Sequence, residues 1–463
     1  MTDRDLGAAV EAWGRSHREE LVRDLIHMVN YPSVSEPGEG GYAFGTNCKN
    51  CADAMMALGT KYGFVPENDD YYTVSVMMPG TSGGELGILG HLDVVPAGDG
   101  WHFAPYDAIE KDDCVIGRGS SDNKGGVLMS LYVMRALKEL GVEFRNTIRL
   151  ICGFNEEQGM KDVEHYLQTH PVPPKYTLVC DGGWAMIVGE KGILNVDLVQ
   201  DASNGNLKEL YAGISANAVP DTARAVLSNV DAEVIKKLAG SDISVAVRNG
   251  DTEITALGKA GHAAFPWAGE NAAYKLLRFL DDNCLVTGAA GKAVKNLAAL
   301  LTDDYGSGIG IAFEDSQSGK TTCVGSILRM KDGKIIQHLD VRYAVTQESA
   351  DILKALESLH TRGIATENLS YSAPRYTDPD APVTKMLLDT VHEFLGPEYK
   401  PFTMGGGTHA RKFPNALPYG PGQVNIEQRF GNAHGIDEAV RMEGLLMSMS
   451  TYAVALKRLD EML

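Results

Sequence analysis

Between residues 72 and 179 the sequence alternates apolar strands with amphipathic helices, and this alternation constrains the fold more than any other feature. The expected strands are 72–78, 86–89, 147–154 and 176–179, and the expected helices are 47–62, 124–140 and 160–169. Parallel strands need long crossover connections, which are usually helices that cover the sheet. The pattern therefore predicts an α/β fold with a mostly parallel sheet flanked by helices.

Around Gly189 the pattern changes to short strands of alternating polarity, separated by turn sequences such as Asn249-Gly250-Asp251. The expected strands are 193–199, 207–214, 243–247, 252–257, 322–330 and 334–343, and the expected helices are 221–238, 271–282 and 349–362. This sequence pattern is typical of an antiparallel sheet with helices on one face, which is an α+β arrangement. A strand, a small-residue turn and a helix occur around Asn217 and again around His262, which indicates an internal duplication.

The length of 463 residues predicts more than one domain, because single hydrophobic cores stop growing near ~250–300 residues. We expect residues 1–188 and 375–463 to form one domain in two parts, with residues 189–374 inserted between them as a second. A helix-rich segment resumes near Tyr376, which is why the chain is expected to return to the first domain.

Composition excludes several classes of partner. The net charge of −19 argues against nucleic acids and anionic membranes, because both are bound through basic surfaces. No apolar stretch approaches the ~20 residues of a membrane span, and the polar N-terminus lacks the apolar region of a signal peptide.

Seven sparse cysteines indicate reduced thiols and a cytoplasmic protein. Cys48 and Cys51 form a lone C-x-x-C pair, which we interpret as two ordinary thiols.

Five short segments carry the polar residues that suggest chemistry, and three of them directly follow expected strands. Their key residues are His91 with Asp93, Asp122, Glu156 with Glu157, Asp181, and His434. Ligands of open α/β sheets gather at the carboxyl ends of the strands, so these side chains are expected to converge. Two imidazoles and three carboxylates suit two divalent metal ions, most readily zinc, with manganese or cobalt as alternatives. Asp122 is our choice for the bridging carboxylate, and Glu156 for the general base that activates a metal-bridging water.

These segments resemble the motifs of the co-catalytic zinc exopeptidases of the aminoacylase, glutamate carboxypeptidase and carnosinase type. Within that family the chain is most similar, over almost its whole length, to bacterial dipeptidases that cleave β-Ala-Xaa. The motifs are Gly90-His91-Leu92-Asp93, Ser121-Asp122-Asn123-Lys124, Asn155-Glu156-Glu157, Asp181-Gly182 and Ala433-His434-Gly435.

The resemblance implies a role for each residue of these motifs. His91, Asp122 and Asp181 would hold one ion, and Asp122, Glu157 and His434 would hold the other. Asp93 would brace His91, Glu156 would act as the base, and the Asp122–Asn123 peptide would be cis.

The resemblance also makes the inserted domain a lid that supplies substrate-binding residues. His262 would stabilise the oxyanion, Asn217 would help to bind the substrate, and Arg342 would grip its C-terminal carboxylate. The loop that contains Gly406, Gly407 and Thr408 would lie beneath the substrate, where its backbone N–H groups can meet a carboxylate. His409 stands where the dipeptidases are expected to have Tyr, and we interpret it as a difference in a substrate subsite.

The resulting hypothesis is a dinuclear metal-dependent dipeptidase that acts on small peptides with a free C-terminal carboxylate. An N-acyl amino acid deacylase, acting on acetyl or succinyl groups, is the alternative within the same family. A catalytically inactive metal-binding protein is a third reading, which the complete ligand set disfavours. A two-carboxylate glycosidase would need separated acids rather than adjacent ones. The duplicated lid favours a monomer, with a homodimer as the alternative.

Overall fold

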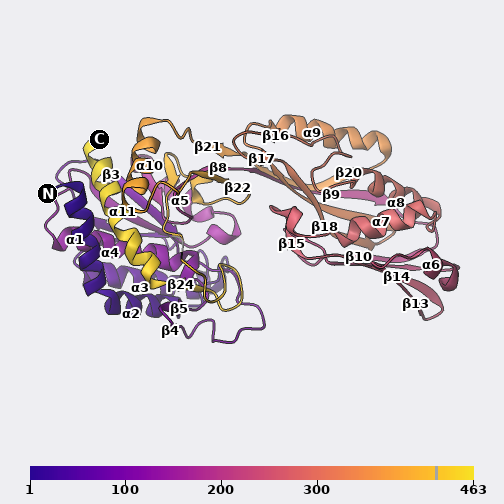
Figure 1. Cartoon of the computed structure of the whole chain (residues 1–463), viewed down its shortest axis with the longest axis horizontal. Helices are drawn as coiled ribbons and strands as arrows, with labels where there is room; N and C mark the ends of the chain where they lie inside the picture. The colour runs from indigo at the N-terminus through magenta and orange to yellow at the C-terminus, as the bar shows by residue number, and fades with distance from the viewer. Residues whose placement is uncertain (423–425) are drawn as a thin grey trace. The chain divides into compact units, whose positions relative to one another are not determined.

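The structure is a computed structural model that describes residues 1–422 and 426–463. The chain divides into two compact units. Figure 1 colours the chain by residue number from the N-terminus to the C-terminus. The first unit comprises Met1–Val188, Thr377–Phe402 and Gly407–Leu463, and the second comprises Gly189–Tyr376 and Thr403–Gly406. The second unit is thus inserted in the sequence of the first, and the chain contributes four more residues to it before it finally returns.

The first unit is built on a six-stranded sheet with the order β1-β2-β6-β3-β7-β23. In that order its strands are Val65–Asp69, Thr73–Met78, Thr147–Gly153, Glu85–His91, Thr177–Val179 and Ala416–Pro418. The pairings from β6 to β23 are parallel, whereas β1 and β2 form an antiparallel edge. The predicted mostly parallel sheet is therefore confirmed.

Helices cover both faces of this sheet. They are α1 (Asp3–Ser16), α2 (Arg18–Val29), α3 (Thr46–Lys61), α4 (Gly125–Glu139), α5 (Lys161–Thr169), α10 (Pro382–Phe394) and α11 (Met442–Met462). Ile88 and Leu150 point into a large core shared with all of these helices except α5. Leu89 and Ile151, the next residues along the same strands, point to the opposite face and pack against α5. Burial on both faces explains why these strands are almost continuously apolar.

The cysteines of the C-x-x-C pair lie on α3 and are buried in the large core. Burial raises the pKa of both Cys48 and Cys51, which keeps them as neutral thiols. Every cysteine of the chain is free in the structure.

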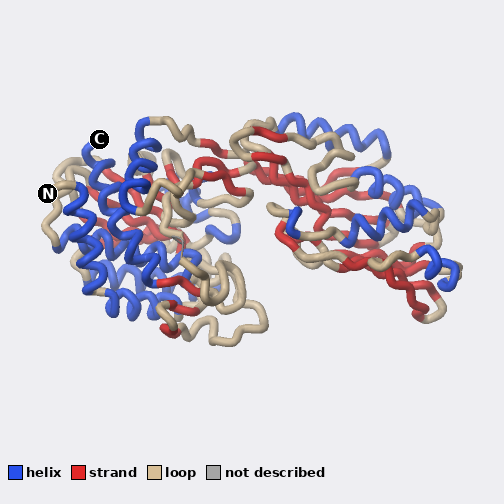
Figure 2. Tube along the Cα trace, in the orientation of Figure 1, coloured by secondary structure: helices blue, strands red, loops and turns tan. Residues whose placement is uncertain are grey.

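The second unit is built on an eight-stranded antiparallel sheet with the order β13-β14-β12-β10-β18-β19-β9-β20. In that order its strands are Ile243–Arg248, Asp251–Leu257, Thr222–Leu227, Leu207–Ala212, Thr322–Lys331, Lys334–Tyr343, Gly192–Asp201 and Ala365–Ser372. Its helices are α6 (Ala232–Leu238), α7 (Ala272–Asp282), α8 (Gly288–Leu300) and α9 (Ser349–Ser358). One hydrophobic core joins this sheet to α6, α7, α8 and α9. Figure 2 shows the helices of this unit in blue and its strands in red.

Four small sheets complete the strands of the described chain. They are β11-β15 (Ala218–Val219, Gly261–His262), β16-β17 (Glu314–Asp315, Gly319–Lys320), β21-β8-β22 (Arg375–Tyr376, Ile187–Glu190, Phe402–Met404) and β24-β5-β4 (Ala439–Arg441, Cys114–Ile116, Ile109–Lys111). Among the described helices, none is both long and apolar enough to cross a membrane.

The prediction of a helix over 221–238 is wrong for the first part of this range, which forms strand β12. This strand lies inside the sheet and pairs with both β10 and β14, so hydrogen bonds to two neighbours override its helical propensity. Asn229 then adopts a left-handed backbone (φ 57°), and α6 begins only after Asp231, whose side chain accepts from Glu233 N at 2.9 Å. The helix expected after Asn217 is thus shortened to α6, which follows strand β12, whereas the helix expected after His262 is present as α7. Helix α8 and strand β20 were not expected from the sequence.

Asp460, fully buried near the end of α11, holds the turn that enters β6. Its carboxylate accepts from Arg145 N at 2.9 Å and from Asn146 N and Nδ2, both at 2.8 Å. We expect Asp460→Ala to lower the free energy of unfolding by about 1–3 kcal/mol, because buried donors lose their partner. Urea unfolding measures the change. Glu461→Ala, at the exposed neighbouring position, is the control, and equal effects of the two substitutions would contradict this account.

Candidate metal centre

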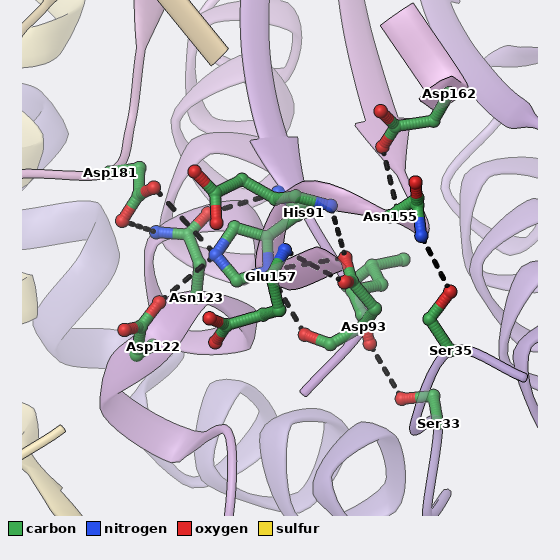
Figure 3. Close-up of polar contacts among 12 residues, drawn as sticks. Ser33, Ser35, His91, Asp93, Asp122, Asn123, Asn155, Glu157, Asp162 and Asp181 are labelled. Carbon is green, nitrogen blue, oxygen red and sulfur yellow. Dashed lines mark hydrogen bonds and ion pairs between the residues drawn. The ribbon is translucent and has the colours of Figure 1, made fainter. Parts of the chain in front are cut away.

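Four of the five predicted metal ligands, His91, Asp122, Glu157 and Asp181, lie together at the carboxyl end of the sheet of the first unit (Figure 3). His91 is the last residue of β3, Asp181 follows β7, and Glu157 lies in the turn that follows β6. Since β3 lies between β6 and β7, these strand ends are neighbours at one edge. Asp122 reaches the same place from the glycine-flanked turn Ser120–Lys124, which leads into α4.

Asp122 is the centre of the cluster because its two carboxylate oxygens face different imidazoles. Oδ1 lies 3.0 Å from His91 Nε2, and Oδ2 lies 3.2 Å from His434 Nε2. Asp181 Oδ2 lies 3.6 Å from the same His91 nitrogen, and Glu157 Oε1 lies 2.9 Å from the His434 nitrogen. The Nε2 atom of each imidazole therefore lies near Asp122 and one further carboxylate. A pair of cations bridged by one carboxylate needs this arrangement.

The donor set fits divalent cations. Two groups of side chains could each hold an ion, and within each group the ligand atoms lie within 4.8 Å of one another. The groups are His91-Asp122-Glu157 and His91-Glu156-Asp181. The carboxylates of this cluster outnumber its two imidazoles, and such negative charge in a sheltered site needs compensation by cations. Imidazole and carboxylate together suit first-row divalent ions.

Mutual contacts displace the pKa values of these groups from their usual range. Burial and the charge of Asp122 raise the pKa of Asp181 to about 7. Burial also opposes ionisation of Asp122, but hydrogen bonds from His434 and His91 prevail and lower its pKa. Hydrogen bonds to Asp122 and Glu157 raise the pKa of His434 to about 10. Protons and metal ions would therefore compete for the same atoms, so that metal affinity should fall in acid.

Asp93 is fully buried behind the cluster and fixes two of its parts. Its backbone oxygen lies 3.0 Å and its Oδ1 lies 3.4 Å from His91 Nδ1, which directs the other ring nitrogen toward Asp122. Its carboxylate also accepts from Glu156 N and Glu157 N, both at 3.2 Å. The contact with His91 was expected from the sequence, whereas the support of the glutamate turn is revealed by the structure.

Asn123 joins the ends of β3 and β7. Its Oδ1 accepts from His91 N at 3.2 Å, and its Nδ2 donates to Cys180 O at 2.5 Å. The Asp122–Asn123 peptide is cis, as the resemblance predicts. Asn123 is buried, so it supports the adjacent ligands from behind.

His409 also lies behind the cluster, and its interpretation as a difference in a substrate subsite stays a prediction. Its side chain is fully buried, with Nε2 3.1 Å from Asp162 Oδ2, and its ring lies edge to face with that of His91 at 6.2 Å. Asp162 Oδ2 also accepts from Asn155 N at 2.9 Å, so His409 supports the turn that carries the glutamates (Figure 3). No sequence motif links residues 162 and 409, and this contact arises only on folding.

In the second unit, Asn217 and His262 are held together by the short sheet β11-β15. Ala218 pairs with His262, and Ala263 N donates to Asn217 O at 2.8 Å. His262 Nδ1 accepts from Ala264 N at 3.0 Å, so Nε2 carries the proton of the neutral ring. The side chain of His262 is thereby defined as a donor through Nε2.

Arg342 lies on β19 in the same unit and is held by a bidentate contact with Asp340, at 2.6 Å for both bonds. Its Nη1 donates to Gly405 O at 3.2 Å. Gly405 is required there, because a Cβ at this position would lie 2.7 Å from Ala264 Cβ. These contacts connect Arg342 to the loop that carries His262. An arginine has five N–H donors, so further donors remain for a ligand.

The glycine-rich loop contributes residues to both units. Gly406 belongs to the second unit, and Gly407 and Thr408 belong to the first. A Cβ at Gly407 would meet the Arg411 side chain at 1.9 Å, so a larger residue would require this flexible side chain to move. Thr408 Oγ1 accepts from Ala410 N at 3.2 Å and caps the turn His409–Arg411.

The fold and the site define a two-unit α/β protein whose strand ends present a histidine and carboxylate cluster suited to divalent cations. The sequence profile of peptidase family M20/M25/M40 matches residues 87–458. The chain therefore belongs to this peptidase family.

Relatives and solved structures match the chain over almost its whole length. YtjP of Bacillus subtilis is 29% identical over 96% of this chain and 97% of its own. The Beta-Ala-Xaa dipeptidase of Lactobacillus delbrueckii subsp. lactis is 28% identical over the same shares. The structure of the di-peptidase Dug1p of Saccharomyces cerevisiae has a TM-score of 0.60 at 15% identity, covering 100% of this chain and 99% of that one. Human carnosine dipeptidase 1 gives a TM-score of 0.58 at 15% identity, covering 98% and 100%.

Binding of a divalent ion by this cluster should stabilise the folded chain. At free zinc roughly 100 times the Kd, one site adds about 2.7 kcal/mol to the free energy of unfolding. We expect zinc to raise the Tm of chelator-treated protein, and Asp122→Ala to lose most of this rise because Asp122 contacts both imidazoles.

Differential scanning fluorimetry with and without zinc measures this effect. Asp389→Ala, on the exposed side of α10, is the matched control and should keep the full rise. A rise of the same size in the Asp122 variant would show that zinc binds elsewhere.

Proposed function

We propose that this chain is a metal-dependent dipeptidase that hydrolyses dipeptides with a free C-terminal carboxylate. The observation that carries the proposal is the placement of Asp122 between two imidazoles, with Glu156 and Glu157 beside it. Membership of a peptidase family, and the full-length similarity to a Beta-Ala-Xaa dipeptidase, support peptide hydrolysis at this cluster.

The cofactor in this proposal is a pair of divalent ions, most readily zinc. His91, Asp122 and Asp181 would hold one ion, and Asp122, Glu157 and His434 would hold the other. When bound, such ions polarise a substrate carbonyl and lower the pKa of a water molecule. The contacts of Asp93 and Asn123 keep His91 in place for this role.

Glu156 is the proposed general base. Burial and the neighbouring carboxylates of Asp181, Glu157 and Asp122 raise its pKa well above the usual value, although His91 opposes this shift. A raised pKa makes the carboxylate a stronger proton acceptor. Glu156 would take a proton from the attacking water and pass it to the leaving amine. Asp93 holds the backbone of this residue, so the carboxylate is carried on a fixed turn.

The second unit would supply the substrate-binding side chains, and we propose that residues 189–374 act as a lid. His262 would donate from Nε2 to the developing oxyanion, a role that fits the hydrogen bond accepted by its Nδ1. Arg342, oriented by Asp340, would bind the C-terminal carboxylate, and Asn217 would bind the peptide. Backbone N–H groups at Gly406, Gly407 and Thr408 would face the same carboxylate. We propose a monomer as the active form.

A substrate panel tests the proposed reaction. We expect hydrolysis of Ala-Ala and β-Ala-His, and little activity on tripeptides, N-acetyl-alanine or N-succinyl amino acids. Preferential release of acetate or succinate would instead establish the deacylase alternative.

The role of Arg342 predicts a further difference within this panel. The dipeptide amide Ala-Ala-NH2 lacks the carboxylate, so its kcat/KM should be lower than that of Ala-Ala. The expected difference corresponds to about 1.5–3 kcal/mol of transition-state stabilisation, the usual range for a hydrogen bond to a charged group. Arg342→Met should remove most of the difference between acid and amide. If the variant still discriminates as the wild type does, Arg342 does not bind the carboxylate.

The base is tested by Glu156→Ala. This variant should keep its bound metal but lose about 10²–10⁴-fold in kcat, the usual contribution of general acid–base catalysis. Metal analysis and kinetics with Ala-Ala measure both quantities. Gln158→Ala, exposed in the same turn, is the control and should keep wild-type turnover. Unchanged turnover in the Glu156 variant would refute the assignment.

A further inference from the structure

A buried ion pair next to the cluster has no part in the mechanism above. Arg118 Nη1 lies 2.6 Å from Glu438 Oε2, and the two side chains are 2% and 0% exposed. The pair joins the segment before the Asp122 turn to the segment after His434, which lie more than three hundred residues apart in the chain. Burial of two charges needs excellent geometry and further hydrogen bonds to be tolerated.

Glu438 binds the backbone of the Asp122 turn. Its Oε1 accepts from Ser121 N and from Asp122 N, both at 3.0 Å. Its backbone oxygen accepts from Gly117 N at 2.8 Å and from Ser120 Oγ at 3.3 Å. This carboxylate therefore determines where the backbone of Asp122 lies.

Arg118 binds the loop of the second imidazole. Its Nη2 donates to His434 O at 3.2 Å and to Ala97 O at 3.3 Å. Its guanidinium also lies 5.1 Å from the centre of the Trp101 ring, within the range of a cation–π contact. His434 has a left-handed backbone (φ 63°), a conformation that a residue other than glycine keeps only where its surroundings hold it.

We propose that Arg118 and Glu438 are positioning residues that fix the separation of Asp122 from His434. They would thereby set the affinity for the ion that these two residues share with Glu157. Both act on backbone atoms, so they orient ligands without contacting the reacting atoms. This inference rests on the proposed function, because it assumes that the cluster binds metal.

The effect should be larger for one of the two ions. His91 is held independently by Asp93 and Asn123, and Asn123 also binds the carbonyl of Cys180, next to Asp181. Loss of the Arg118–Glu438 pair leaves these contacts in place. The ion near His91 and Asp181 shares Asp122 but keeps these other supports, so its affinity should fall less than that of the ion near His434.

The test compares Arg118→Met, Glu438→Met and the double variant. A single substitution leaves one buried charge unpaired and risks misfolding, whereas the double variant removes both charges. Arg149→Met with Glu85→Met is the matched control. Arg149 is another buried arginine, bound to Glu85 through two bonds of 2.9 Å, and both residues lie on the strands β6 and β3 outside the cluster.

Zinc bound per chain is measured after equilibration at buffered free zinc concentrations, and Tm is measured on metal-free protein. We expect two ions in the wild type and in the control. The double variant should fold. Its affinity for the ion near His434 should fall about 10–100-fold, as for other outer partners of metal ligands, whereas its affinity for the ion near His91 should fall less. Cobalt-substituted protein should show the matching unequal loss of the two ions in its visible spectrum.

Three results would contradict the inference. A folded double variant that binds two ions with wild-type affinity would reduce the pair to a structural ion pair, and the proposed function would stand. A wild-type chain that binds no divalent ion would contradict the proposed function and the positioning role together. An equal fall in the affinity for both ions in the double variant would contradict the larger effect on the ion near His434.

Discussion

The site depends on the approach of Asp122 to two imidazoles at once. Each oxygen of this carboxylate faces a different histidine, and further carboxylates surround the pair. Such a concentration of like charges is unfavourable without cations, and it needs rigid support from the rest of the fold. Most of the other polar contacts near the cluster supply that support, because they hold the backbone or the far side of a ligand rather than its metal-facing atoms.

The sheet supplies the first part of this support. Its central strands β6, β3 and β7 end side by side, so three short turns bring their polar residues to one edge. Asp93 then couples two of these turns, because it contacts His91 and accepts from the backbone of Glu156 and Glu157. His409 and Asp162 brace the glutamate turn from behind. Rigid strand ends and buried partners together give the ligands little freedom to separate.

The second part of the support comes from residues that are far apart in the chain. The Arg118–Glu438 pair connects the Asp122 turn to the His434 loop. In the second unit, Arg342 is the proposed carboxylate-binding residue. Gly405 and Ala264 connect it to the loop of His262. In both units the chemically important side chain is held by backbone contacts from a distant segment. A substitution at either connection would therefore affect function without touching a reacting group.

The sequence by itself determined the α/β class, the mostly parallel sheet and the convergence of the strand-end residues, because apolar periodicity and strand-end position are local properties of the chain. It did not determine strand β12, whose form depends on hydrogen bonds to two neighbouring strands. It did not determine the contact of His409 with Asp162, because only tertiary packing brings these two residues together. The sequence likewise did not predict the Arg118–Glu438 ion pair, because no local pattern in either segment indicates which residue it will contact. Local patterns thus predict which residues form the site, whereas long-range packing decides what holds them in place.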